Sequence, residues 1–351
     1  MLSGLAEFME HQRERRRLNV NQQIILLERP EGWVTTEHFK LIESPVPVPG
    51  DGEILVRNHW LSLDPYMRGR ISAAKSYAQG VEPGQLMVGG TIGEVIESRA
   101  DGFKPGDMIL AATGWQLFAA LPAEQALKIE DAGEGIPITA HLGVIGMPGI
   151  TAWTGLMTIC EPRRGETVVV DAASGAVGSV VGQLAKSIGC RVVGIAGGPS
   201  KCSYVVNELR FDACVDHKDP LFEARLQEAL PNGIDCLFEN VGGAVFEALL
   251  PRMNAFSRIA LCGMVSEFNR PPHAHHTLRS ILVNRIKLQG FIVSDHMQTW
   301  PAIRQELKAR VVNGQIKFRE SIAHGLANAP AAFVGMLKGE NFGKQLVKLT
   351  D

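Results

Sequence analysis

The hydrophobic and polar positions follow two different rhythms along the chain. From about residue 23 to 121, short apolar runs alternate with turn-forming residues. The runs predict strands at 23–27, 53–57, 89–96 and, after a Pro-Gly-Asp turn, within 103–111. Many short strands separated by glycine- and proline-rich turns are typical of an antiparallel barrel.

Beyond residue 143 the pattern becomes an alternation of apolar strands and amphipathic helices, which opens with a helix after the hinge at 146–150. The expected strands are 167–170, 191–195, 213–216, 234–240, 258–263 and 286–293. This alternation predicts an α/β fold with a doubly wound parallel sheet. From about residue 314 the rhythm stops, and we expect the chain to return to its first domain. The predicted organisation is an extension at 1–19, a β-rich domain at 20–144 and 313–351, and a parallel-sheet domain at 145–312.

A glycine-rich turn joins the first strand of this second half to its helix. Val168–Val170 leads into Asp-Ala-Ala-Ser-Gly-Ala-Val-Gly-Ser, and an apolar-periodic helix follows. Gly175 suits a tight turn, Gly178 suits close approach of the backbone to a pyrophosphate, and Gly182 suits close helix–strand packing. Ala173 stands where the first glycine of the usual pattern would be. The setting predicts a Rossmann-type dinucleotide site, and the alternative is an ordinary turn between strand and helix.

The end of the second strand indicates which dinucleotide is bound. An NAD site places Asp or Glu here to hold the ribose 2′-hydroxyl, but the chain has no acid between Cys190 and Lys201. Lys201 follows Gly-Gly-Pro-Ser and suits a 2′-phosphate. We therefore expect NADP(H) rather than NAD(H), although Lys201 at a helix start is also compatible with a solubilising role alone.

Composition and charge place the chain among ordinary globular enzymes. It has 351 residues, 45% hydrophobic and 21% charged, with a formal net charge of −2, so neither nucleic acid nor a membrane surface is an expected partner. The apolar runs fall short of the roughly 20 residues of a membrane span. The six cysteines, without a Cys-x-x-Cys spacing, predict buried free thiols and a cytoplasmic location. Residues 1–19 place their positive charges after the apolar stretch, unlike a secretory signal, and are expected to be a frayed extension.

Six motifs in sequence order carry a family resemblance over nearly the whole chain. They are Leu-Ser-Leu-Asp-Pro-Tyr-Met-Arg-Gly-Arg at 61–70, Gly-Met-Pro-Gly-Ile-Thr-Ala at 146–152, Ala-Ser-Gly-Ala-Val-Gly-Ser at 173–179, Glu-Asn-Val-Gly-Gly at 239–243, Cys-Gly-Met-Val-Ser at 262–266 and Leu-Lys-Gly-Glu-Asn-Phe-Gly-Lys at 337–344. The chain resembles the zinc-independent medium-chain dehydrogenases/reductases, in the branch of prostaglandin, leukotriene B4, curcumin and alkenal/one double-bond reductases. The resemblance implies a GroES-like barrel domain beside the Rossmann domain.

The resemblance also implies residue roles. Gly175, Ala176, Val177, Gly178 and Ser179 would cradle the pyrophosphate, and Lys201 would meet the 2′-phosphate. His217 stands where many relatives have a tyrosine near the adenine ribose, and its contribution would fall above about pH 6.5. The remaining matched cofactor positions are Asn240, Cys262, Gly263, Met264, Val265, Ser266, Phe268, Phe291, Ile292, Val293 and Asn341.

The donor residues argue against a catalytic metal. The barrel domain contains no cysteine, and Asp64–Tyr66 and Val88–Gly90 stand where zinc-dependent relatives have ligand motifs. His273, His275 and His276 form the other candidate, in a proline-rich loop without a sequence neighbour that completes a site. The interpretation is a solvated or substrate-rim loop and a metal-free reductase.

The expected reaction is NADPH-dependent reduction of the C=C bond of an α,β-unsaturated ketone or aldehyde, with hydride going to the β-carbon. Relatives place a tyrosine hydroxyl at the position of Phe268 to support the developing oxyanion, and phenylalanine cannot donate. Of the three tyrosines, Tyr66 lies in a family motif and is the predicted donor, whereas Tyr204 is expected to be structural and Tyr77 has no assigned role. The alternative is that Tyr66 only packs the cleft wall and that the cofactor ribose supports the enolate. Arg68 and Arg70 are expected at the surface or along the cleft.

The sequence leaves two alternative functions open and predicts an oligomeric state. A quinone reductase uses the same fold, and a non-catalytic NADPH-binding sensor would be compatible with Phe268. The apolar run 285–293 reads as a late edge strand, and an unpaired edge strand predicts a homodimer joined through the nucleotide domains.

Overall fold

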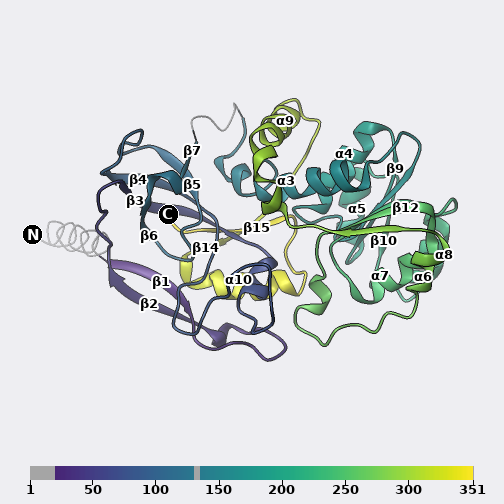
Figure 1. Ribbon diagram of the computed structural model, residues 1–351, viewed down its shortest axis with the longest axis horizontal. Helices are drawn as coiled ribbons and strands as arrows, with labels where there is room; N and C mark the ends of the chain where they lie inside the picture. Colours follow the sequence, from purple (N-terminus) through teal and green to yellow (C-terminus); the bar gives the residue numbers. More distant parts are fainter. Residues whose placement is uncertain (1–19, 130–134, 351) are drawn as a thin grey trace, which may run out of the picture. The chain divides into compact units, whose positions relative to one another are not determined.

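The computed structural model describes residues 20–129 and 135–350, so the extension at 1–19 lies outside the described chain. These residues form two compact units (Figure 1). We call the first the antiparallel unit, which comprises 20–129, 322–336 and 345–350. The second, the parallel-sheet unit, comprises 135–321 and 337–344.

The antiparallel unit consists of short strands that form two sheets. The strands are β1 (Val20–Leu26), β2 (Phe39–Pro45), β3 (Glu53–Leu63), β4 (Thr91–Ser98), β5 (Met108–Ala111), β6 (Phe118–Pro122), β7 (Leu127–Lys128), β14 (Glu320–His324) and β15 (Lys344–Lys348). The larger sheet has the order β14-β15-β3-β4-β5-β7, β6 also pairs with β3, and β1 pairs with β2. The expected strand at 53–57 is longer than predicted, because β3 continues through a second partner, β15.

The antiparallel unit closes around two buried groups. Alternate residues of β3, including Ile54 and Val56, pack with Val95 and Ile109. Separately, the Trp115 ring lies 5.6 Å from Phe39 and 5.7 Å from Phe333. Phe333 belongs to α10 (Ala329–Leu337), so burial of its aromatic side chain anchors the returning C-terminal segment. The other helical elements are α2 (Tyr66–Arg70), η1 (Thr36–His38), η2 (Ala123–Gln125) and η8 (Leu326–Asn328).

The parallel-sheet unit confirms the doubly wound α/β prediction. Its strands are β8 (Thr167–Val170), β9 (Arg191–Ala196), β10 (Ala213–Asp216), β11 (Ile234–Glu239), β12 (Met253–Leu261) and β13 (Lys287–Gly290). They pair in parallel in the order β10-β9-β8-β11-β12-β13. In sequence order, β8 is the first strand of this sheet. The strands β9 and β10 are then added on one side of it, and β11, β12 and β13 on the other. The expected strand 286–293 is shorter than predicted and lies at the edge.

Helices cover both faces of this sheet. They are α3 (Met147–Trp153), α4 (Gly178–Ile188), α5 (Pro199–Asn207), α6 (Phe222–Ala229), α7 (Gly243–Leu249), α8 (Arg279–Val283) and α9 (Trp300–Val312), with η3 (Ile138–Leu142), η4 (Thr154–Cys160), η5 (Leu250–Arg252), η6 (Val265–Glu267) and η7 (Val293–Thr299). Val168 and Val170 pack with α4, whereas Val169 packs with α6 and α7 on the opposite face. In Figure 1, α4 and α7 lie on opposite sides of the strands. Burial on both faces explains the continuous apolar runs of the strands.

The compact units divide the chain differently from the expected boundaries at 144/145 and 312/313. Ala140 and Ile316 lie in the same buried cluster as the strands of the parallel sheet. The parallel-sheet unit therefore includes η3 before the predicted boundary, and the segment up to residue 321 after it. Residues 337–344 also belong to it.

Candidate dinucleotide site

The glycine-rich turn after β8 has the strand–turn–helix geometry that the sequence predicts. Gly175 N donates to Ala172 O at 2.8 Å, and Ser179 N donates to Gly175 O at 3.1 Å as α4 begins. A Cβ on Gly178 would lie 2.5 Å from Ala172 O, so this position requires glycine. The left-handed residue of the turn is Ala172, with φ +45°, and not a glycine. The half-exposed residues 175–177 place backbone groups at the N-terminus of α4, where an anionic diphosphate is favoured.

The third glycine has a different partner from the predicted one. A Cβ on Gly182 would collide with the Phe211 ring, and Phe211 precedes β10 in a connecting segment. The expectation of close helix–strand packing at Gly182 is therefore wrong in its partner. The glycine instead allows a buried aromatic ring to fill the space beside α4.

The turn lies at the reversal point of the sheet. Because β8 pairs with β9 on one side and with β11 on the other, the carboxyl ends of β8 and β11 lie next to each other where the strand order reverses. Ligands of doubly wound sheets bind at such a point. Gly343 bridges to Gly175 in parallel, and Asn341 Nδ2 donates to Gly343 O at 2.8 Å. The predicted cofactor residue Asn341 thus lies beside the glycine-rich turn, although the two are far apart in sequence.

Two cationic side chains and a histidine meet at the end of β9. A Cβ on Gly197 would lie 2.8 Å from His217 Nε2 and 3.2 Å from Lys218 Cε. Lys201, in the first turn of α5, donates from Nζ to Gly339 O at 2.7 Å. Burial lowers the pKa of Lys201, and the nearby Lys218 ammonium lowers it further. Such converging positive charge suits a dianionic phosphate.

Lys218 is a candidate residue that the sequence reasoning missed. It directly follows His217 at the end of the third strand, and that adjacency was the available signal. The neighbouring acid, Asp216, is turned toward the backbone, where Oδ1 accepts from Gly198 N at 2.8 Å and Lys218 N at 2.9 Å. Asp216 therefore shapes the two loops around the cationic group.

His217 is less basic than its position alone suggests. Burial lowers the pKa of His217 below its ordinary value, Lys218 and Lys201 lower it further, and Asp216 only partly opposes them. The expectation that its charge fades above about pH 6.5 is corrected to a lower pH in the ligand-free chain. At neutral pH the positive charge at this end of the site resides on Lys201 and Lys218.

A buried pair of carboxyl groups organises the reversal point. Asp171 directly follows β8, and Glu239 is the last residue of β11. Both side chains are 0% exposed. Asp171 accepts from Asn240 N at 2.7 Å and from Val241 N at 3.1 Å. Glu239 Oε1 accepts from Val241 N at 2.7 Å and Gly242 N at 2.6 Å. Burial raises the pKa of Glu239 well above its usual range, and the Asp171 carboxylate raises it further, which favours the protonated form of Glu239.

The other matched cofactor segment is tied to this pair through the backbone. Cys262 N donates to Glu239 O at 2.9 Å, Val265 N to Asn240 O at 3.1 Å, and Ser266 N to Val241 O at 2.9 Å. Residues 262–266 and Asn240 therefore form one cluster at the carboxyl ends of β11 and β12. Phe268 caps η6 within this cluster and is half-buried.

Residues 291–293, which match cofactor positions of the family, directly follow β13. The Phe291 ring is buried in the core, 6.1 Å from Phe238 and edge-on to it. Val293 packs at the margin of the same core and its carbonyl accepts from Trp300 Nε1 at 3.2 Å. Ile292 is half-buried between them. Contact of Phe291 with a cofactor would thus involve its backbone.

Tyr66 lies in the antiparallel unit, at the first position of α2. Burial raises its pKa far above the ordinary value and Asp64 raises it further, while Arg70 partly opposes this, so the phenol stays protonated. Arg68 is only 5% exposed and donates to Gly32 O at 2.9 Å, which makes it a structural residue and corrects its predicted surface location. Tyr77 is 60% exposed, whereas Tyr204 packs edge-on against Phe342 at 5.0 Å.

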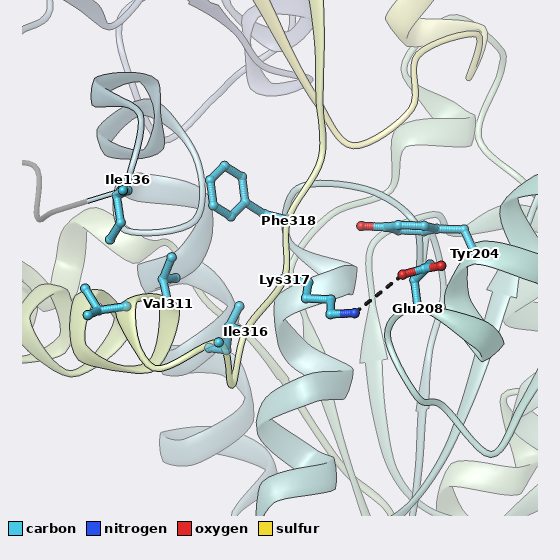
Figure 2. A pocket seen from close by; sticks show the side chains of 10 residues that line it. Ile136, Tyr204, Glu208, Val311, Ile316, Lys317 and Phe318 are labelled. Atoms are coloured by element: carbon cyan, nitrogen blue, oxygen red, sulfur yellow. Dashed lines mark hydrogen bonds and ion pairs between the residues drawn. The ribbon is translucent and has the colours of Figure 1, made fainter.

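A surface pocket of about 540 Å³ lies in the parallel-sheet unit (Figure 2). Tyr204 of α5 and Glu208, which directly follows α5, line one side, and Ile136, Val311 and Ile316 line the other. Lys317 and Glu208 form an ion pair of 3.4 Å across it. None of the predicted cofactor residues lines this pocket.

The histidine loop has a neighbour that the sequence did not indicate. Glu247 of α7, which is distant in sequence, lies close to His273 and His275. Of the six cysteines, Cys160, Cys190 and Cys236 are buried, and the other three are half-buried. Within the described chain, no helix combines the length and the apolarity that a membrane crossing demands.

Comparisons with known proteins identify the family. Residues 22–129 match the family described as the N-terminal domain of oxidoreductase, and residues 176–309 match the zinc-binding dehydrogenase family. The NADPH-dependent curcumin reductase of Escherichia coli (strain K12) is 43% identical over 336 residues, covering 94% of this chain and 97% of that protein. The NADP(+)-dependent 2-alkenal reductase of Nicotiana tabacum is 37% identical, covering 94% and 98%.

A solved structure agrees over the same span. The crystal structure of CurA from Vibrio vulnificus in complex with NADPH has a TM-score of 0.90 and 44% identity, covering 94% of this chain and 99% of that one. The chain therefore belongs to the medium-chain dehydrogenase/reductase family, in the branch that contains the curcumin, 2-alkenal and prostaglandin reductases.

The buried carboxyl pair yields a stability prediction. A group whose pKa is raised by folding stabilises the protein below its unfolded pKa, and this contribution is lost as pH rises through the folded pKa. Glu239→Gln removes that titration and keeps the acceptor oxygen for Val241 N and Gly242 N. We expect Glu239→Gln to raise the Tm more at pH 8 than at pH 5, by about 2–4 °C for each 1 kcal/mol gained.

Asp171→Asn is the matched contrast, because Asp171 accepts several N–H groups and an amide offers one acceptor oxygen fewer. This variant should lower the Tm at both pH values, and scanning calorimetry measures the change. Equal Tm changes for Glu239→Gln at pH 5 and pH 8 would show that Glu239 is not the protonated member.

Proposed function

We propose that this protein is an NADPH-dependent reductase of the C=C bond of α,β-unsaturated ketones and aldehydes. The observation that carries the proposal is the proximity of His217 and Lys218 to Gly197 at the end of β9, with Lys201 near enough to both to affect them electrostatically. The named activities of relatives aligned over 94% of the chain support the substrate class.

The residues fit NADPH in three respects. The turn at 175–179 lies at the N-terminus of α4, where the helix dipole favours a pyrophosphate. The Lys201–Lys218 pair offers charge to the 2′-phosphate, and the Asn240–Ser266 cluster borders the reversal point of the sheet. When bound, NADPH supplies the hydride. The chain's own task is to orient the two reactants and to donate a hydrogen bond to the carbonyl oxygen, on which negative charge develops.

Tyr66 is the donor that we propose for that oxygen. Burial raises the pKa of its phenol, so the hydroxyl keeps the proton that it needs to donate a hydrogen bond. Phe268, in place of the family tyrosine, cannot supply this hydrogen bond.

We also propose that the reaction needs no zinc. The chain offers Asp64-Pro65-Tyr66 and Val88-Gly89-Gly90 where zinc-dependent relatives carry ligands, and Asp64 accepts from the Ser62 hydroxyl. The half of the chain before residue 160 has no thiol donor. The six cysteines, which are free of disulfides, support a cytoplasmic location.

A screen of NADPH oxidation tests the substrate class. Enones and enals should give at least tenfold higher kcat/KM than quinones or saturated ketones of similar size. Preference for quinones would favour the quinone reductase alternative, and binding of NADPH without turnover on any acceptor would favour a sensor.

The exposed edge of the parallel sheet supports a homodimer. All residues of β13 are exposed, and near it Leu282 is 79% and Phe256 68% exposed. A second copy pairing along β13 would cover Leu282 and Phe256 and would provide hydrogen-bond partners for the backbone of the edge strand. Light scattering at micromolar concentration should give twice the 38.1 kDa chain mass.

The Leu282→Glu variant should shift the protein toward the monomer, because a charge would be buried in the interface. Val48→Glu, at an equally exposed apolar position of the antiparallel unit, should leave the mass unchanged. A wild-type mass of one chain would contradict the dimer.

A further inference from the structure

The loop between η6 and α8 brings two histidines to a carboxylate of α7. The candidate ligand atoms of Glu247, His273 and His275 all lie within 4.8 Å of one another, and all three residues are half-buried. The residues come from two separate elements, because Glu247 lies on α7 and the histidines lie about 30 positions later. Two imidazoles and one carboxylate are the donor set of many open zinc sites.

The His275 ring is held on both of its nitrogens. Nδ1 lies 3.1 Å from Glu247 Oε2, and Nε2 lies 3.7 Å from Glu267 Oε1. The edge of the ring also packs against Phe246, with centroids 5.5 Å apart. In metal sites, a ligating histidine donates its other N–H to a carboxylate, which fixes the tautomer and the ring orientation. Glu267 stands where such an orienting carboxylate is needed.

The two carboxylates are themselves fixed by the backbone. Glu247 Oε1 accepts from His276 N at 2.9 Å, which leaves Oε2 on the side of His275. Glu267 accepts from Gly243 N at 3.0 Å and His273 N at 3.2 Å. The His273 ring lies 5.0 Å from the His275 ring. Ligand atoms around a tetrahedral zinc ion lie roughly 3.3 Å apart, given bonds of about 2.0–2.2 Å, so a small closure of the loop would complete the site.

We propose that Glu247, His273 and His275 bind one divalent transition-metal ion, with zinc as the best fit, and that Glu267 orients His275. The site lies on the parallel-sheet unit and is separate from the reduction chemistry, so it does not rest on the proposed function. Glu267 belongs to η6, which is followed by Phe268. A bound ion would link the loop that carries His273 and His275 to Glu247 on α7, and would therefore stabilise the folded protein.

Calorimetric titration of chelator-treated, full-length protein with zinc chloride tests the site. We expect one equivalent to bind with a saturable isotherm and to raise the Tm, as any ligand of the folded state does. His273→Ala and Glu247→Gln should abolish this binding. Glu267→Gln should weaken it by about 10- to 100-fold, as loss of an orienting carboxylate does.

Matched controls separate this site from incidental zinc binding. His276→Ala removes the exposed neighbouring ring but keeps the backbone N–H that Glu247 accepts, and it should bind zinc like the wild type. Circular dichroism of each metal-free variant checks that it is folded. The proposal is overturned if the wild type shows no saturable binding, or if His273→Ala and Glu247→Gln bind normally. It is also overturned if Cys202→Ser abolishes the binding, because Cys202 and Cys214 have sulfur atoms 3.0 Å apart and would then be the ligands.

Discussion

Lys201→Ala should raise the KM for NADPH by roughly 10- to 150-fold and leave the KM for NADH nearly unchanged. The expected loss is that of one charge-assisted phosphate contact, about 1.5–3 kcal/mol. Only NADPH carries the 2′-phosphate, so only its binding should suffer. Steady-state kinetics with both cofactors measures the effect.

Lys218→Ala is the second arm of this test. Lys218 lies close enough to Lys201 to lower its pKa, and we expect a smaller change in the same direction and a larger one in the double variant. Lys287→Ala, an exposed lysine at the opposite edge of the same sheet, is the control and should change neither KM. An equal rise in the KM for NADPH and for NADH in Lys201→Ala would contradict the assignment of Lys201 to the 2′-phosphate.

Tyr66→Phe should lower kcat for an enone by about 10²–10³-fold, the usual effect of removing one oxyanion donor. A partly redundant ribose hydroxyl of the cofactor would reduce this loss. NADPH binding, followed by fluorescence titration, should persist. Tyr77→Phe alters a tyrosine that is 60% exposed and should retain full kcat.

Phe268→Tyr is the reciprocal change, because it restores the hydroxyl that relatives carry with little added volume. We expect it to raise kcat or to rescue Tyr66→Phe in part. If Tyr66→Phe has no effect and Phe268→Tyr changes nothing, neither phenol supports the oxyanion, and a quinone becomes the better acceptor.

Local patterns predicted the strands of the parallel sheet well. Ala213–Asp216 is a strand with the bounds that its apolar run indicates, and the turn at 175–179 joins strand to helix as expected. These features depend on neighbours in sequence. The edge position of β13 also followed from its late place in the alternation, although its length did not.

Features that depend on distant partners could not be read from the sequence. Gly182 requires glycine because of the Phe211 ring, 29 positions later. The position of Asn341 beside Gly175 depends on the return of residues 337–344 to the parallel-sheet unit. Glu247 joins the histidine loop only because α7 packs next to it. Lys218 belongs to both groups, since its adjacency to His217 was visible but its approach to Lys201 was not.

The atom that receives the hydride tests the proposed reaction most directly. The protein should be incubated with NADPH deuterated at C4 of the nicotinamide, on each face in turn, and with an α,β-unsaturated ketone, and the product should be analysed by NMR and mass spectrometry. For a C=C reductase we expect a saturated ketone that carries one deuterium at the β-carbon, from one of the two labelled cofactors. An allylic alcohol with deuterium on the carbinol carbon, or recovery of unreacted ketone, would contradict the proposed reaction.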